Sequence, residues 1–74
     1  MDKLKVRTFI LEYLVSAKTE VTELSISDHL WRCGIKRERQ FFDVLDEMEK
    51  DGLIQRDQDF CYKLTVKGAV EYNK

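Results

Sequence analysis

Apolar residues recur at helical spacing along the first stretch of the chain, KLKVRTFILEYLVSA, residues 3–17. A second apolar row, spaced at i, i+4, i+7 and i+11, falls on nearly the opposite side of the same helix. Because so short a chain has little with which to cover two sides of a helix, we favour packing of the second row on another molecule over packing within the domain. The broad first face would carry Val6, Phe9, Ile10, Tyr13, Leu14 and Ala17, and the second row Leu4, Thr8, Leu11 and Val15.

A glycine separates the next two predicted helices. Residues 18–24 lack a helical period and predict a short strand or an extended connection. Ser25, with Asp28 three residues later, resembles a capping box and predicts a second helix over about residues 26–33. Gly34 would end that helix, as a left-handed residue commonly does.

The third predicted helix spans about residues 36–51, and neither glycine nor proline interrupts it before Gly52. Its charges are segregated: residues 35–42 contain three basic residues and one acidic residue, whereas residues 43–51 contain one basic residue and five acidic ones. The helical period places the buried stripe at Phe41, Val44, Leu45 and Met48, and the solvent side at Lys36, Arg39, Gln40, Asp43, Glu47 and Lys50.

From Leu53 onward the period changes from helical to alternating. Residues 53–64 predict two strands joined around residues 57–59 by a loop of about three to five residues. Alternation would put Phe60, Tyr62 and Leu64 on one face of the second strand and Cys61 and Lys63 on the other.

A last short helix is predicted over about residues 66–73, with Thr65 as its cap and Val70 on its inner side. Gly68 weakens such a helix by roughly 1 kcal/mol relative to alanine. We therefore expect a packing reason for this glycine.

The expected order is helix, strand, helix, helix, strand, strand, helix, in a single α+β domain over residues 1–74 with a small three-helix core and a β-hairpin. Seventy-four residues are near the lower size at which one core holds a fold alone. No apolar run approaches the roughly 20 residues of a membrane span, and no secretory leader opens the chain. We expect a cytoplasmic location and no membrane partner.

Candidate catalytic and metal-binding groups are sparse. Cys33 and Cys61 lie 28 residues apart and His29 is the single histidine, whereas a zinc site needs four ligands, usually in close pairs. We expect no metal, no cofactor and two reduced thiols, although a disulfide stays open if the fold joins them. The serines have no nearby base, and the chain leaves little room for a substrate pocket. We expect no enzymatic activity and no small-molecule substrate.

Three motifs together resemble the winged helix-turn-helix domain of small transcriptional regulators. The first is a short helix that ends at Gly34 and is followed by a longer one. The second is LDEMEKDGLI, residues 45–54, similar to the family's Leu-x-x-Leu-x-x-x-Gly-Leu-Ile. The third is YKLTVKG, residues 62–68, similar to the Tyr-x-Leu-Thr-x-x-Gly that closes the wing in MarR-like and PadR-like regulators. The resemblance covers almost the whole chain and implies binding of double-stranded DNA, with the third helix in the major groove.

The resemblance implies that the start of the third helix meets the DNA. Arginine can contact guanine and glutamine adenine with two hydrogen bonds each, while lysine and arginine also suit phosphates. The alternative is a solvated helix face on which Arg39 pairs with Asp43. For the hairpin residues, contact with DNA and an ordinary solvated surface are equally consistent with the sequence. The candidate DNA-contacting residues are Lys36, Arg37, Arg39, Gln40, Arg56, Gln58 and Lys63.

We expect a homodimer joined through the first helix and Tyr72 of the last. Two copies would place their third helices about 34 Å apart, on successive turns of a duplex. The candidate interface residues are Leu4, Thr8, Leu11, Val15 and Tyr72.

The chain departs from the family pattern in two places. The second predicted helix carries about one extra turn, Trp31 to Cys33, and the hairpin turn is acidic where family wings usually carry Lys or Arg. We interpret Trp31 as a core or interface anchor rather than an exposed stacking platform. Because the net charge is −1 and the wing is acidic, the alternative function is a winged-helix protein-interaction module without DNA binding.

Overall fold

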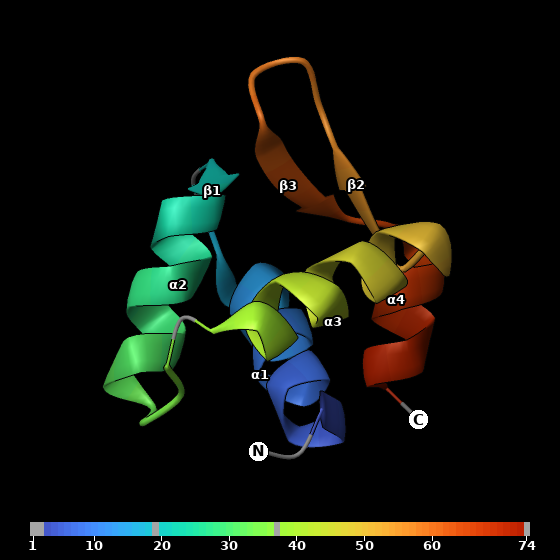
Figure 1. The fold of residues 1–74 in the computed structure, drawn as a ribbon. Helices are drawn as coiled ribbons and strands as arrows, with labels where there is room; N and C mark the ends of the chain where they lie inside the picture. The colour runs from blue at the N-terminus through green and yellow to red at the C-terminus, as the bar shows by residue number, and fades with distance from the viewer. Residues whose placement is uncertain (1–2, 19, 37, 74) are drawn as a thin grey trace.

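A computed structural model describes residues 3–18, 20–36 and 38–73 of the chain. The described residues form an α+β fold of four helices and one small antiparallel sheet (Figure 1). In chain order the elements are α1 (Lys3–Ser16), β1 (Val21–Thr22), α2 (Glu23–Arg32), α3 (Arg39–Lys50), β2 (Ile54–Arg56), β3 (Cys61–Leu64) and α4 (Val66–Tyr72).

The sheet joins the hairpin to the short strand that precedes α2. Its order is β1-β3-β2, with Val21 opposite Tyr62 and Gln55 opposite Lys63. Figure 1 shows the β2–β3 hairpin projecting away from the four helices. The predicted short strand and hairpin are therefore confirmed, and the loop of residues 57–60 has a length within the expected range.

Helix α1 lies at the centre of the core. It contacts α2, α3 and α4, and in Figure 1 it passes behind α3 with α2 on one side and α4 on the other. The predicted first face of α1 and the predicted stripe of α3 provide much of the apolar interior. The largest fully buried side chains include Ile10, Ile26, Leu30, Phe41, Met48 and Leu53.

Helix α2 begins three residues earlier than predicted. Thr22 rather than Ser25 is its cap, since the Thr22 hydroxyl accepts the Ser25 backbone N–H at 3.2 Å. Both residues have a hydroxyl that can cap a helix. Pairing with Cys61 in the sheet holds Thr22 in the extended conformation typical of a cap, and Thr22 is therefore the residue that caps α2. The helix ends as predicted at Gly34, whose φ of +84° allows the Ile35 N–H to reach the Leu30 carbonyl at 2.8 Å.

Helix α3 begins three residues later than predicted, so Lys36 precedes the helix instead of lying on it. Ile35 is buried in the core directly after the turn at Gly34. Glu38, which has an extended conformation, precedes α3 as its N-cap residue without a side-chain hydrogen bond. The predicted end at Gly52 is confirmed, because its φ of +77° lets the Leu53 N–H reach the Met48 carbonyl at 2.9 Å.

Helix α4 is tied to the junction between α3 and β2. The hydroxyl of Thr65, its predicted cap, accepts the Gly68 N–H at 3.0 Å and lies 2.6 Å from the Gly52 carbonyl and 2.9 Å from the Leu53 carbonyl. The Lys67 ammonium donates to the Asp51 carbonyl at 2.7 Å.

Gly68 has the packing reason that we expected. A Cβ at this position would overlap the Leu53 carbonyl oxygen and lie 2.7 Å from Leu64 Cδ1. The prediction for Val70 is wrong, because its side chain is 56 % exposed. Gly68 occupies the buried side of this two-turn helix and leaves Val70 on the outside.

Phe60 belongs to the hairpin turn and not to the strand, contrary to prediction. One Asp57 carboxylate oxygen accepts the N–H groups of Asp59 and Cys61, each at 2.9 Å, and the Asp57 carbonyl accepts the Phe60 N–H at 3.1 Å. This turn requires a left-handed residue at its last position, and Phe60 has a φ of +60°. Cys61 and Tyr62 are both buried, so burial does not alternate at the start of β3, and the predicted division of side chains between its two faces stays a prediction.

Among residues 3–18, 20–36 and 38–73, no helix is both long and apolar enough to traverse a lipid bilayer.

Candidate nucleic-acid interface

The start of α3 presents two basic side chains to solvent. Lys36 lies before the helix and Arg39 is its first residue, and both are exposed. Neither forms an ion pair with another described residue, so the predicted alternative of an Arg39–Asp43 pair is absent there. Arg37, the remaining basic candidate at this end, lies outside the described residues.

Gln40 does not face solvent as predicted. It is half-buried, and its Oε1 atom is buried without a hydrogen-bond partner among the described groups. A buried amide oxygen without a partner costs about 1–3 kcal/mol. In this arrangement the amide oxygen of Gln40 is turned away from solvent, whereas Arg39 is exposed.

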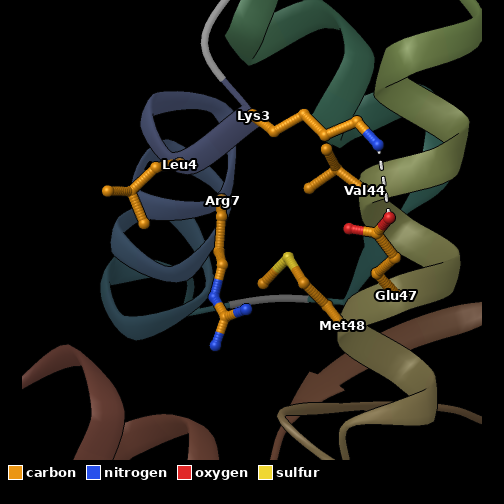
Figure 2. A pocket seen from close by; sticks show the side chains of 6 residues that line it. All are labelled: Lys3, Leu4, Arg7, Val44, Glu47 and Met48. Carbon is orange, nitrogen blue, oxygen red and sulfur yellow. Dashed lines mark hydrogen bonds and ion pairs between the residues drawn. The ribbon is translucent and has the colours of Figure 1, made fainter.

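Among the described residues, three of the five carboxylates of residues 43–51 pair with basic residues of neighbouring elements. Glu47 pairs with Lys3 of α1 at 3.3 Å, a contact that Figure 2 shows across a shallow pocket between the two helices. Asp51, just after α3, pairs with Arg7 of α1 at 3.6 Å. Such exposed pairs contribute at most about 1 kcal/mol each to stability, so their main effect here is on the local charge.

A third pair extends this neutralisation to the hairpin. Glu49 lies 3.9 Å from Arg56 of β2. Asp43 and Asp46 form no ion pair within the part of the chain that the structure describes. The unpaired carboxylates of α3 are therefore in its first two turns, next to Arg39.

The hairpin candidates lie together but are mostly occupied by other contacts. The Arg56 guanidinium also sits 5.7 Å from the centre of the Phe60 ring, and the Lys63 ammonium lies 3.9 Å from the Asp57 carboxylate. Gln58 is exposed in the turn. Because Arg56 contacts Glu49 near the end of α3, this group is toward the opposite end of the helix from Lys36 and Arg39.

The candidate dimer residues gather at a shallow pocket between α1 and α4. Leu4, Thr8, Leu11 and Tyr72 line it, and Val15 is exposed further along α1. The second apolar row is not uniformly outward as predicted, because Leu11 is buried in the core. Leu11 is covered because α4 packs on α1. The helical period of α1 alone does not reveal this packing.

Trp31 is exposed, so its interpretation as a core residue is wrong. Its side chain is 64 % exposed and lines a small apolar hollow with Gly34 and Lys36. The helical period could have identified this, since Trp31 lies seven residues after Leu24 and opposite the buried Ile26 and Leu30.

Both cysteines are free thiols in different surroundings. Burial raises the pKa of the Cys61 thiol above its ordinary value of 9.0, and the nearby carboxylates of Glu20 and Asp57 act in the same direction. Cys33 is exposed, with its Sγ 3.9 Å from Nε2 of His29, whose ring stacks on Tyr13. Within the described ranges, no three metal-ligating side chains cluster together.

No family model, curated protein or solved structure matches the chain. Its function is therefore inferred from its own residues and their arrangement.

Proposed function

We propose that the chain is a winged helix-turn-helix domain that binds double-stranded DNA as a small transcriptional regulator. In support, the elements follow the order that the sequence resemblance implies. A short helix, a tight turn at Gly34 and a second helix precede a β-hairpin that pairs with β1. In such domains the second helix of the pair, here α3, lies in the major groove with its first residues at the base edges.

The charge distribution on α3 carries the proposal. Lys36 and Arg39 are exposed without ion pairs within the described ranges, whereas Glu47, Glu49 and Asp51 are each paired with a basic residue of α1 or β2. This arrangement leaves Lys36 and Arg39 available at the end that would enter the groove, with Asp43 and Asp46, unpaired among the residues that the structure describes, one and two turns after Arg39, and it reduces the repulsion of phosphate farther along. Arg39 is the candidate for a guanine contact and Lys36 for a phosphate contact.

The same proposal includes a homodimer. The exposed apolar groups of α1 and α4 provide a surface for a second copy, and a two-fold pair would place two α3 helices about 34 Å apart on one side of a duplex. A role on DNA agrees with the cytoplasmic location expected from the sequence.

The test is a binding titration of the wild-type chain on labelled fragments of genomic DNA at low salt, followed by selection of the bound fragments. Arg39→Ala should weaken binding to the selected duplex by about tenfold, as expected for loss of one contact to a base. Lys50→Ala is the matched control, because it removes the same charge from the exposed last residue of α3. We expect it to have little effect. Absence of binding by the wild type, or equal losses in the two variants, would overturn the proposal.

The second candidate function is a protein-interaction module, and the hairpin favours it. Arg56 and Lys63 are both compensated by carboxylates, and the exposed turn carries Asp59 without a paired cation among the described residues. Retention on heparin and DNA columns separates the two functions. Retention at low salt that disappears with added salt supports DNA binding, and no retention at low salt supports the protein-interaction module.

A further inference from the structure

The end of α2 exposes a large aromatic side chain that the core does not use. Trp31 is the single tryptophan of the chain and lies in the last turn of α2. Its ring lines an apolar hollow with Gly34 and Lys36. Gly34 has no side chain there, so one side of the hollow is formed by backbone.

The sequence around this hollow is basic. Residues 31–40 contain four basic residues and one acidic residue. Arg32, Lys36 and Arg39 are exposed, and within the described ranges none of them forms an ion pair. The exposed carboxylates nearest in sequence are Asp28, one turn before Arg32, and Glu38 at the start of α3. A flat aromatic group inside an excess of cations is complementary to a polyanion that also has apolar surface.

We propose that Trp31 and Lys36 hold the sugar–phosphate backbone of the duplex beside the groove that α3 enters. The indole ring packs against a deoxyribose, the indole N–H donates to a phosphate oxygen, and the Lys36 ammonium pairs with a neighbouring phosphate. Trp31 then contributes affinity for every sequence and fixes the position of α3, without reading bases. This inference rests on the proposed function and adds a second contact region to it.

Trp31 provides its own probe, since excitation at the red edge of the absorption band reports the single tryptophan and leaves out the tyrosines. The duplex selected with the wild-type chain is titrated while two signals are followed: the anisotropy of a dye on the DNA and the protection of Trp31 from quenching by acrylamide. We expect both signals to saturate at the same DNA concentration. Saturating anisotropy with unchanged quenching would overturn the Trp31 contact and leave the proposed function intact. No change in either signal would overturn both.

Variants separate a direct contact from a change in structure. Trp31→Ala should weaken binding of the selected duplex and of an unrelated duplex by the same factor, about tenfold, which corresponds to one hydrogen bond to a charged oxygen and its apolar contact. Leu24→Ala is the matched control, because Leu24 is 68 % exposed on the same face of α2. We expect it to keep wild-type affinity, and an equal loss in both variants would contradict the proposal.

The salt dependence of binding distinguishes the role of Lys36 from that of Trp31. Lys36→Gln should reduce the slope of log affinity against log salt by about 0.9, the value for one phosphate contact. Trp31→Ala should leave that slope unchanged, since the indole is neutral. An unchanged slope for Lys36→Gln would remove Lys36 from the proposed contact.

Discussion

Phe60 holds a backbone conformation that favours glycine, at the tip of the hairpin. Its side chain is 69 % exposed, so little packing compensates for the left-handed φ of +60°. For residues with a Cβ this conformation costs roughly 1–2 kcal/mol. The position is the one in which such hairpin turns commonly carry glycine.

Phe60→Gly should therefore be more stable than Phe60→Ala, by about 1 kcal/mol in urea unfolding. Both variants lose the ring and its contact with the Arg56 guanidinium. The difference between their free energies of unfolding therefore reports the cost of the left-handed backbone conformation. Equal unfolding midpoints with equal slopes would show that the turn relaxes around any residue at this position.

The raised pKa of the Cys61 thiol predicts that the free energy of unfolding decreases at alkaline pH. Because the folded chain raises the thiol pKa, the folded state holds the proton to a higher pH than the unfolded state. The corresponding stability is fully present below the unfolded pKa, near 9.0, and falls as pH rises from there through the folded pKa. Burial also raises the pKa of Tyr62 above 10.0, which extends the loss to higher pH.

Urea unfolding between pH 7 and pH 10 measures this effect. Cys61→Ala should reduce the loss of stability over that range, and the exposed Cys33→Ala should retain it. If both variants lose stability with pH as the wild type does, the burial of Cys61 is not the cause.

At the scale of elements, the apolar period of the sequence predicted the buried side of a helix more accurately than the residue at which the helix begins. The α3 stripe from Phe41 to Met48 follows directly from its spacing, and all four predicted residues are buried. The starts of α2 and α3 depend on contacts distant in sequence, such as the pairing of Thr22 with Cys61, which spacing does not encode. The core alternative for Trp31 is wrong because its helical phase places the side chain outside, whereas an interface role for it stays a prediction.

Gly68 ties α4 to the backbone of Leu53, and this gives a prediction for the element. Gly68→Ala should destabilise the chain by about 1–3 kcal/mol in urea unfolding, because the added methyl group meets a carbonyl oxygen that cannot move freely. Intrinsic helix propensity alone predicts the opposite sign, a gain of roughly 1 kcal/mol. The exposed Val70→Ala is the control on the same helix and should change stability little. A more stable Gly68→Ala variant would show that α4 can shift away.

At the scale of the whole molecule, the structure shows which residue of the second apolar row is suited to a test of the proposed dimer. Leu11 is part of the core, so a charge there would disturb folding and association together. Leu4 is 68 % exposed on the same row of α1. The difference between these two residues could not be read from their spacing, because it depends on where α4 packs.

Leu4→Glu should halve the mass measured by light scattering and retain the helical circular dichroism of the wild type, since it places a charge in the proposed interface. Leu24→Glu is matched in exposure on α2 and should leave the mass unchanged. A monomeric wild type, or an unchanged mass for Leu4→Glu, would contradict this interface.

The ion pairs on α3 also belong to this scale. Lys3 and Glu47 are 44 positions apart, and Arg7 and Asp51 are equally distant in sequence. The sequence shows an acidic run at residues 43–51, and contacts between elements of the described chain pair three of its five carboxylates with basic residues in the folded molecule.

The hydrogen bonds that join α4 to the end of α3 have a consequence for the duplex that the proposed dimer would bind. If α4 forms part of the dimer contact, the reading helices cannot swing independently, and the protein fixes the spacing between half-sites. One inserted base pair would displace a half-site by about 3.4 Å and rotate it by roughly a tenth of a turn. The DNA, rather than the hinge of a flexible protein, would have to absorb that twist.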